Sequence, residues 1–200
     1  REFLRKLKLE EKYLQNIITS GEAAMHAINK NEFGKLFYHL GPSRDESIFE
    51  KVKKNKTKIE NSEFILCTGL IDEHERNLNY YKIFLKDLIS KKLICTNPDI
   101  TVHRGDKEEY CAGAIAKIFE SLGGEVIYFG KPHNEIYKMC FNSKEKVIAI
   151  GDNLRTDIKG ANNLNIDSIF ISNGVHRDEF KNNEELIKLL KKYKVNSNYF

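Results

Sequence analysis

Short apolar segments alternate with helical patterns over the last third of the chain. The order is strand, helix, strand, helix, strand, helix over residues 125–129, 132–141, 146–150, 156–163, 167–172 and 184–193. The strand segments are apolar along almost their whole length, which is typical of strands that helices cover on both faces. This alternation predicts an α/β fold with a doubly wound parallel sheet, whose ligand lies beyond the carboxyl ends of the strands.

The N-terminal region is predicted to begin with a helix, a strand and a second helix. Residues 1–9 place apolar side chains on one face, as a short amphipathic helix does. A strand is expected over residues 16–19. Thr19 and Glu22 have the spacing of a capping box, in which a hydroxyl and a carboxylate satisfy free amides at the start of a helix over residues 23–28.

The middle of the chain alternates β-like segments with helical ones, separated by polar, lysine-rich linkers. Strands are expected over residues 35–40, 63–68 and 93–96, and helices over residues 79–90 and 110–122. Gly123 and Gly124 supply a left-handed stop after the last of these helices. A domain boundary is therefore expected at this point.

Composition and charge exclude several classes of function. The net charge of +4 is small and the lysines are spread along the 200 residues, so the sequence does not indicate a nucleic-acid partner. No apolar run approaches the ~20 residues that cross a bilayer, so we expect a cytoplasmic protein with no membrane partner. The four cysteines form no Cys-x-x-Cys pair, as is typical of buried, reduced thiols. The sequence leaves a homo-oligomer open.

Two aspartates follow the second of the C-terminal strands. The segment Gly151-Asp-Asn-Leu-Arg-Thr-Asp157 comes directly after residues 146–150. Asp152 closes the strand and Asp157 opens the next helix, so both carboxylates can approach one point above the sheet edge. Two oxygen ligands with room for water and phosphate are how proteins usually hold Mg²⁺. The alternative for Asp157 alone is a helix cap that favours the positive end of the helix dipole.

A lysine follows the preceding strand. Gly130-Lys131-Pro132 comes after residues 125–129, and proline at the first helical position leaves Lys131 at the carboxyl end of that strand. An ammonium group at this place can neutralise both a phosphate and a carboxylate. Because phosphoryl transfer depends largely on positioned charge, we predict a catalytic role for Lys131. The alternative is a solvated surface lysine.

These segments resemble the motifs of a known superfamily. Gly130-Lys131-Pro132 followed by Gly151-Asp-x-x-x-Thr-Asp157 is similar to the third and fourth motifs of the haloacid dehalogenase superfamily. Ile-Thr-Ser-Gly-Glu22 and Thr96-Asn-Pro-Asp99 extend the resemblance to its subclass IIA, the NagD-like and p-nitrophenyl-phosphatase-like enzymes. In that subclass a large α/β cap is inserted between the second and third motifs.

The resemblance implies a domain organisation and a reaction. Residues 1–21 and 123–200 would form the Rossmann-like core, and residues 22–122 would form the inserted α/β cap domain. The reaction expected of the intact protein is Mg²⁺-dependent hydrolysis of a phosphate monoester through an aspartyl-phosphate intermediate. The expected substrate is a small phosphorylated metabolite.

The resemblance also implies roles for individual residues. Asp152 would ligate Mg²⁺, and Asp157 would support the metal directly or through water. Lys131 would hold the phosphate and the nucleophilic carboxylate in place, so that Lys131 and Asp152 are the catalytic residues expected. Asn97 and Asp99 would lie on the cap surface that faces the substrate, although Asn-Pro is also a frequent turn dipeptide.

The first motif of the superfamily, Asp-x-Asp, occurs nowhere in the 200 residues. In the superfamily its first aspartate attacks phosphorus and its second shuttles a proton, and a second motif supplies a Thr or Ser. We therefore expect that the sequence begins after both motifs. The 200-residue chain by itself is then expected to be inactive, whereas the full-length protein is expected to be a phosphatase.

Other readings of the sequence stay open. A member of this superfamily that has lost its activity would serve as a phosphate-ligand-binding or regulatory protein. The same sheet pattern also occurs in flavodoxin-like and receiver-like binding modules, which would give Lys131 no specific role and would have no large cap. Among the isolated histidines, His133 is expected to be a polar residue at a helix start or a substrate contact. His176 follows the last strand and is considered for the rim of the site.

Overall fold

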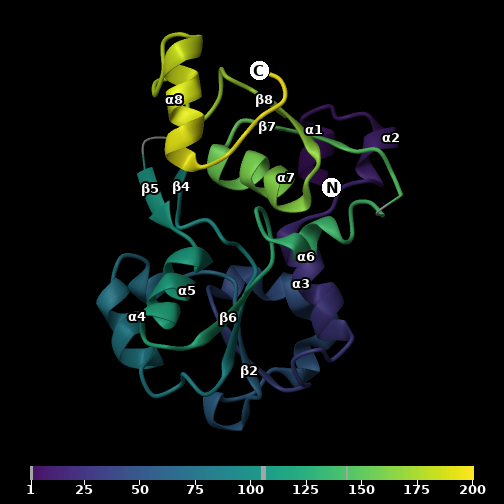
Figure 1. Cartoon of the computed structure of the whole chain (residues 1–200). Helices are drawn as coiled ribbons and strands as arrows, with labels where there is room; N and C mark the ends of the chain where they lie inside the picture. The colour runs from purple at the N-terminus through teal and green to yellow at the C-terminus, as the bar shows by residue number, and fades with distance from the viewer. Residues whose placement is uncertain (1, 105–106, 143) are drawn as a thin grey trace. The chain divides into compact units, whose positions relative to one another are not determined.

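The computed structural model describes residues 2–104, 107–142 and 144–200. The chain divides into two compact units, Arg1–Gly130 and Lys131–Phe200. Each unit combines helices with parallel strands (Figure 1), so the predicted α/β fold class is confirmed. None of the helices formed by the described residues combines the length and the apolar content that a membrane crossing requires.

The first unit contains a four-stranded parallel sheet and an antiparallel hairpin. Its strands are β1 (Phe37–Leu40), β2 (Phe64–Cys67), β3 (Lys92–Cys95), β4 (Thr101–Arg104), β5 (Lys107–Tyr110) and β6 (Glu125–Tyr128). Its helices are α1 (Glu2–Lys6), α2 (Glu11–Leu14), α3 (Ser20–Asn29), α4 (Leu78–Leu85) and α5 (Ala112–Ser121), with 3-10 helices η1 (Ser43–Asn55), η2 (Ile59–Asn61) and η3 (Asp72–His74).

The parallel sheet has the strand order β1-β2-β3-β6. Side chains of a strand point alternately to its two faces, so Ile65 and Cys67 lie on one face of β2 while Phe64 and Leu66 lie on the other. All four side chains are fully buried. This burial on both faces explains why the central strand is apolar without interruption.

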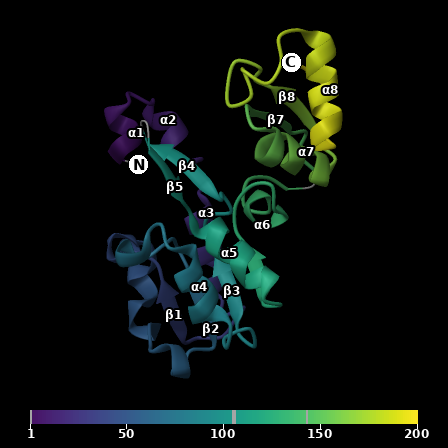
Figure 2. The ribbon, with the colours of Figure 1, turned by 90° about the vertical axis from the view of Figure 1, so that its left-hand side faces the viewer.

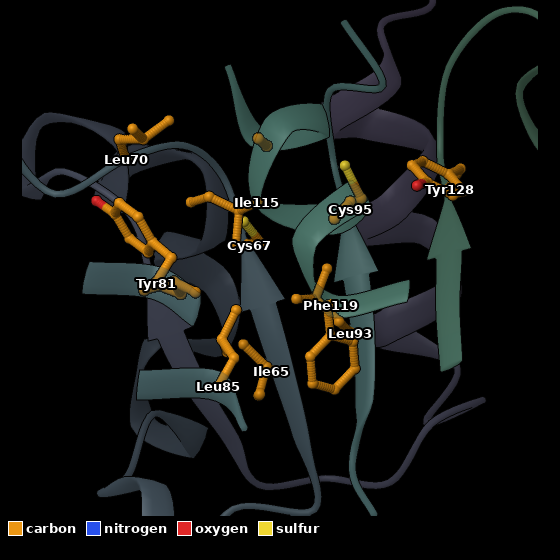
Figure 3. Close-up of a cluster of buried hydrophobic side chains, with 13 residues drawn as sticks. Ile65, Cys67, Leu70, Tyr81, Leu85, Leu93, Cys95, Ile115, Phe119 and Tyr128 are labelled. Atoms are coloured by element: carbon orange, nitrogen blue, oxygen red, sulfur yellow. The ribbon is translucent and has the colours of Figure 1, made fainter. Parts of the chain in front are cut away.

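Helices α4 and α5 cover one face of this sheet. Tyr81 and Leu85 from α4 and Phe119 from α5 point toward Ile65 and Leu93 of the sheet, as Figure 3 shows. These side chains are fully buried. Each buried side chain of this size stabilises the fold by roughly 1.5–3 kcal/mol. The cluster therefore fixes α5, and the loop that precedes it, against the sheet.

The opposite face of the sheet is aromatic. The ring of Phe37 lies 5.3 Å from that of Phe49 and 5.8 Å from that of Phe64, measured between centroids. Phe33 approaches Phe64 and Phe129 edge-on at 6.1 and 6.2 Å. Edge-on and offset contacts of this kind are the favourable arrangements for aromatic pairs.

The capping box predicted for the helix after residue 19 is confirmed. The Thr19 hydroxyl accepts a hydrogen bond from the amide of Glu22, and the Glu22 carboxylate accepts one from the amide of Thr19. The strand predicted over residues 16–19 is wrong, because residues 17–19 form neither helix nor strand and lead directly into this cap. The hairpin of β4 and β5 was not predicted, and it projects away from the sheet (Figures 1 and 2).

The second unit is built on two parallel strands. Its elements are α6 (Asn134–Tyr137), β7 (Ile148–Gly151), the π-helical turn η4 (Leu154–Ile158), α7 (Lys159–Leu164), β8 (Asp167–Phe170) and α8 (Asn183–Tyr193). Leu154, Phe170 and Leu186 are buried in one cluster that joins η4, β8 and α8. The expected cover on both faces is not found for β7, where Ile148 and Ile150 are 45% and 63% exposed.

Strand β6 belongs to the first unit. It pairs with β3, so that Val126 lies beside Leu93, whereas β7 pairs with β8. The structural division therefore falls after Gly130 and not at the expected boundary after residue 122, and residues 1–21 lie in the same unit as residues 22–122. The assignment of core and cap roles to the two units stays a prediction.

Replacing Gly113 by alanine is expected to destabilise the first unit. A Cβ atom at Gly113 would lie 2.2 Å from the carbonyl oxygen of Pro98 and 2.4 Å from that of Asp99, and backbone atoms cannot turn away as a side chain can. The free energy of unfolding in urea should fall by about 1–3 kcal/mol. The matched control is Gly21→Ala, also at the second position of a helix, where the nearest atom is 3.7 Å away. Equal unfolding free energies for the two variants would contradict the prediction.

The stability of the first unit is expected to decrease below pH 6.5 because of His39. Burial, with the nearby charge of Lys56, lowers the pKa of the His39 imidazole to about 4, and its Nε2 lies 2.9 Å from the Thr68 hydroxyl. Between pH 6.5 and pH 4, the histidine of the unfolded chain therefore binds a proton more readily than that of the folded chain, and protonation favours unfolding. The unfolding free energy should fall by about 2 kcal/mol from pH 7 to pH 5.

Urea titrations of the protein and of His39→Gln at both pH values measure this effect. The variant should show a smaller decrease on acidification, whereas His26→Gln, a change at an exposed histidine, should behave as the unchanged protein. An identical pH dependence in all three proteins would show that His39 is not responsible.

Candidate active site

Asp152 follows β7 directly and lies against the backbone of another loop. Its Oδ2 accepts a hydrogen bond of 3.1 Å from the amide of Val175. A Cβ atom at Gly174 would lie 2.3 Å from the Asp152 Cβ and 2.4 Å from its Oδ2. The carboxylate can therefore lie at the carboxyl end of β7 only because residue 174 is a glycine.

Asp157 lies in the π-helical turn that follows. The amide of Asn153 donates to its Oδ2 at 3.1 Å, and the Lys131 ammonium contacts its Oδ1 at 2.5 Å. A Cβ atom at Gly151 would lie 2.2 Å from the Asp157 Cγ. The missing side chain at the end of β7 is therefore the space into which the Asp157 carboxylate turns. π-Helical turns of this kind are frequent at functional sites.

Lys131 combines this ion pair with partial exposure. Its side chain is 51% exposed, whereas that of Asp157 is 10% exposed. The backbone before α6 is held by Asn163, whose Nδ2 donates to the Pro132 carbonyl at 3.2 Å. A half-exposed ion pair stabilises a fold only modestly. The ammonium group is therefore positioned at the aspartate while still accessible to a ligand.

Tyr137 of α6 packs against α7, the helix that follows the π-helical turn. A Cβ atom at Gly160 would lie 1.9 Å from the Tyr137 hydroxyl oxygen, so α6 and α7 approach as closely as they do only because Gly160 has no side chain. Burial, and next the negative charge of Asp157, raise the pKa of Tyr137 to about 12. The hydroxyl consequently stays protonated beside the carboxylate at ordinary pH.

The arrangement fits a magnesium ion. Both aspartates lie at the carboxyl end of β7, one directly after the strand and one folded back over Gly151. No group of three or more potential metal ligands from His, Cys, Asp and Glu is found among residues 2–104, 107–142 and 144–200. Mg²⁺ is usually bound through one or two carboxylates, with waters and substrate phosphate completing its octahedron. Asp152 and Asp157 match this donor set, and their roles as ligands stay a prediction.

Asn97 and Asp99 lie in the first unit, in the loop after β3. The Asn97 Oδ1 accepts a hydrogen bond of 3.1 Å from the Asp99 amide, and the Cys95 thiol donates to the Asn97 carbonyl at 3.2 Å. The amide of Gly113 donates to the Asp99 carbonyl at 3.1 Å. The Asn97 side chain therefore forms the turn that an Asn-Pro pair favours. The substrate contact expected of both residues stays a prediction.

Sequence reasoning missed Gly174 and Val175, which lie against Asp152, and it considered His176 only for the rim of the site. His176 is fully buried, so it does not lie at an exposed rim. His133 is the residue that precedes α6, in agreement with its reading as a helix start. The signal for Gly174, Val175 and His176 was available, because they follow β8, and residues after parallel strands gather at one edge of the sheet.

Comparison with known proteins identifies a set of relatives. A family model described as HAD-hydrolase-like matches residues 128–190. Acid sugar phosphatase of Staphylococcus haemolyticus is 25% identical over 169 residues, which are 80% of this chain and 62% of that protein. Ribonucleotide monophosphatase NagD of Escherichia coli is 32% identical over 88 residues, which are 42% of this chain and 34% of NagD. The chain therefore spans less than two thirds of the length of these curated relatives.

A solved structure extends the comparison to most of the chain. The crystal structure of a haloacid dehalogenase-like hydrolase from Brucella suis superimposes with a TM-score of 0.69 at 32% identity, over 80% of this chain and 65% of that one. The family-model match over residues 128–190 includes Lys131, Asp152 and Asp157. The chain therefore belongs to the haloacid dehalogenase superfamily, in its subclass IIA of NagD-like and p-nitrophenyl-phosphatase-like proteins.

Proposed function

We propose that the protein, at its full length, is a Mg²⁺-dependent phosphatase that hydrolyses phosphate monoesters. The observation that carries this proposal is the contact of the Lys131 ammonium with Asp157, beside Asp152 at the end of the same strand. The relatives named acid sugar phosphatase and ribonucleotide monophosphatase support it. Because the chain spans only part of those relatives, the activity is proposed for the whole protein.

The described residues would bind the metal ion, neutralise the phosphate and orient the ester. When bound, Mg²⁺ supplies positive charge against the phosphate oxygens, and Asp152 and Asp157 would hold it. Lys131 would neutralise a second part of the phosphate charge and orient the ester, since its ammonium group is accessible and anchored at Asp157. Phosphoryl transfer depends mainly on such positioned charge.

The nucleophile would come from outside these 200 residues. No Asp-x-Asp occurs in the sequence, and the expected aspartyl-phosphate requires a carboxylate that attacks phosphorus. In this proposal water then hydrolyses the aspartyl-phosphate and releases inorganic phosphate. The set of Lys131, Asp152 and Asp157 would be the part of the site that this chain contributes.

The substrate class follows from the relatives in general terms only. Their names specify a sugar phosphate in one case and a ribonucleotide in another, so we propose a small phosphorylated metabolite. Asn97 and Asp99 are the proposed substrate contacts of the first unit.

The proposed location of the protein is the cytoplasm. Its cysteines are free, and Cys67, Cys95 and Cys111 are buried, which agrees with a reducing compartment.

Asp152→Asn in the full-length protein is expected to lower kcat for small phosphate esters by about 100-fold or more. The amide keeps the size of the side chain but removes the negative charge that attracts the metal. The chelator EDTA should abolish the activity of the unchanged protein, and added MgCl₂ should restore it. Asp178→Asn is the control, since this carboxylate belongs to the same unit and is 90% exposed. Activity that is indifferent to EDTA or to Asp152→Asn would refute the proposed function.

The 200-residue chain by itself is expected to show no Mg²⁺-dependent turnover of p-nitrophenyl phosphate. It lacks the Asp-x-Asp motif that supplies the nucleophile in the superfamily. Release of p-nitrophenol by the chain and by the full-length protein, at equal concentrations with MgCl₂, checks this expectation. Turnover by the chain that disappears in Asp152→Asn would mean that another residue is the nucleophile.

A further inference from the structure

A closed circuit of hydrogen bonds surrounds the beginning of the π-helical turn. The amide of Leu154 donates to the His176 Nε2 at 3.1 Å, and the His176 Nδ1 lies 2.6 Å from the Glu179 carboxylate. The Tyr193 hydroxyl contacts the same carboxylate at 3.1 Å. Arg155, the next residue of the turn, closes the circuit by donating to the Tyr193 hydroxyl at 2.7 Å. Two consecutive residues of the turn are thus bound by one polar circuit.

The circuit specifies the tautomer of His176. A backbone amide can only donate, so the Nε2 that faces Leu154 must present its lone pair and carry no proton. The proton of the neutral ring is therefore on Nδ1, where it points at Glu179. Although burial opposes ionisation, the hydrogen bonds from His176 and Tyr193 lower the pKa of Glu179, so the acceptor at this end is a carboxylate. The carboxylate thus holds the ring in the one state that can accept from Leu154.

His176 has few alternatives to this orientation. The side chain is fully buried, and its ring lies 5.1 Å from that of Tyr193 and 6.2 Å from that of Phe170, measured between centroids. If the ring turned away, the Leu154 amide would be left without its partner in a buried place, at a cost of about 1–3 kcal/mol. The packed rings and the two hydrogen bonds therefore hold the Nε2 at a defined point.

The same segment also holds Asp152. The amide of Val175 donates to the Asp152 Oδ2, and Gly174 leaves room for that carboxylate. Gly174, Val175 and His176 therefore contact both ends of the segment that runs from Asp152 to Leu154. Residues 152 and 157 can keep a constant separation only if the backbone between them keeps its path. His176 binds that backbone at Leu154.

We infer that His176 is a positioning residue for the metal site, which acts through the Leu154 amide and never touches metal or substrate. This inference rests on the proposed function and adds a residue to it. Partners that orient a metal-binding segment affect metal affinity strongly, and their loss typically costs 10–100-fold. A purely structural histidine, in contrast, would affect the unfolding of the protein and leave Mg²⁺ affinity unchanged.

Two amide variants separate these roles. In His176→Gln the side-chain carbonyl can reach the place of the Nε2 and accept from Leu154. In His176→Asn the shorter amide reaches only the place of the Nδ1, so it can donate to Glu179 but leaves Leu154 unbonded. Both variants remove the ring from its contacts with Phe170 and Tyr193, so both thermal unfolding midpoints should decrease, and that of His176→Asn should decrease further because the buried Leu154 amide loses its acceptor.

The decisive measurement is the Kd of MgCl₂ alone for the full-length protein, by calorimetry well below both unfolding midpoints. His176→Asn should raise this Kd about 10-fold or more, and His176→Gln should leave it near that of the unchanged protein. Amide exchange of Leu154 should accelerate in His176→Asn only. Equal Kd values for the two variants would overturn the inference.

A second measurement needs neither metal nor activity. ¹⁵N NMR of the histidine side chains in the 200-residue chain should give an unprotonated, pyridine-type shift for the His176 Nε2 and a protonated, pyrrole-type shift for its Nδ1. The reverse assignment would overturn the inference. If the full-length protein binds Mg²⁺ with the expected order of Kd values but hydrolyses no phosphate ester, the proposed function fails while the role of His176 stands.

Discussion

The burial of the Asp157 carboxylate is the constraint on which the second unit depends. A charge that leaves water must be compensated by hydrogen bonds and an opposite charge, and Asp157 obtains both from the Asn153 amide and from Lys131. Each compensation fixes a further part of the chain. The amide requires the π-helical path of η4, and the lysine requires the turn between β6 and α6 to come to the end of β7. The geometry of the site follows from satisfying one buried anion.

The parts of the fold that could be predicted are those with local causes. Strands β7 and β8 were visible as short, almost uninterrupted apolar segments, and helix α8 was visible because its apolar residues repeat with the helical period. Thr19 and Glu22 were recognised because a capping box is complete within four residues. Asp152 was predicted as a site residue because it directly follows a strand, and Asp157 because it opens the helical segment that comes next. Lys131 was predicted to lie near the aspartates because each group follows an apolar strand segment, and the contact of Lys131 with Asp157 agrees with this reasoning.

The parts that could not be predicted depend on partners distant in sequence. Strand β6 has the apolar pattern of the later strands, yet β3 is its neighbour, and no local pattern specifies which strand pairs with which. The charged segment Lys107–Tyr110 has low β propensity and becomes a strand only through its antiparallel partner. Likewise His176 looked isolated in the sequence, since Leu154 and Glu179 become its neighbours only when β8 has brought its loop beside η4.

Glycines shape the site as much as charged groups do. The spaces left by Gly151, Gly160 and Gly174 are filled by Asp157, Tyr137 and Asp152 respectively, at distances where no Cβ atom fits. For folding, these three positions should therefore tolerate less variety than the carboxylates themselves, since Asn preserves the shape of an aspartate while alanine at these glycines displaces the side chain that fills the space. An engineer who wishes to alter the chemistry of this protein would do best to redesign the acidic groups and to treat the empty volumes beside them as fixed.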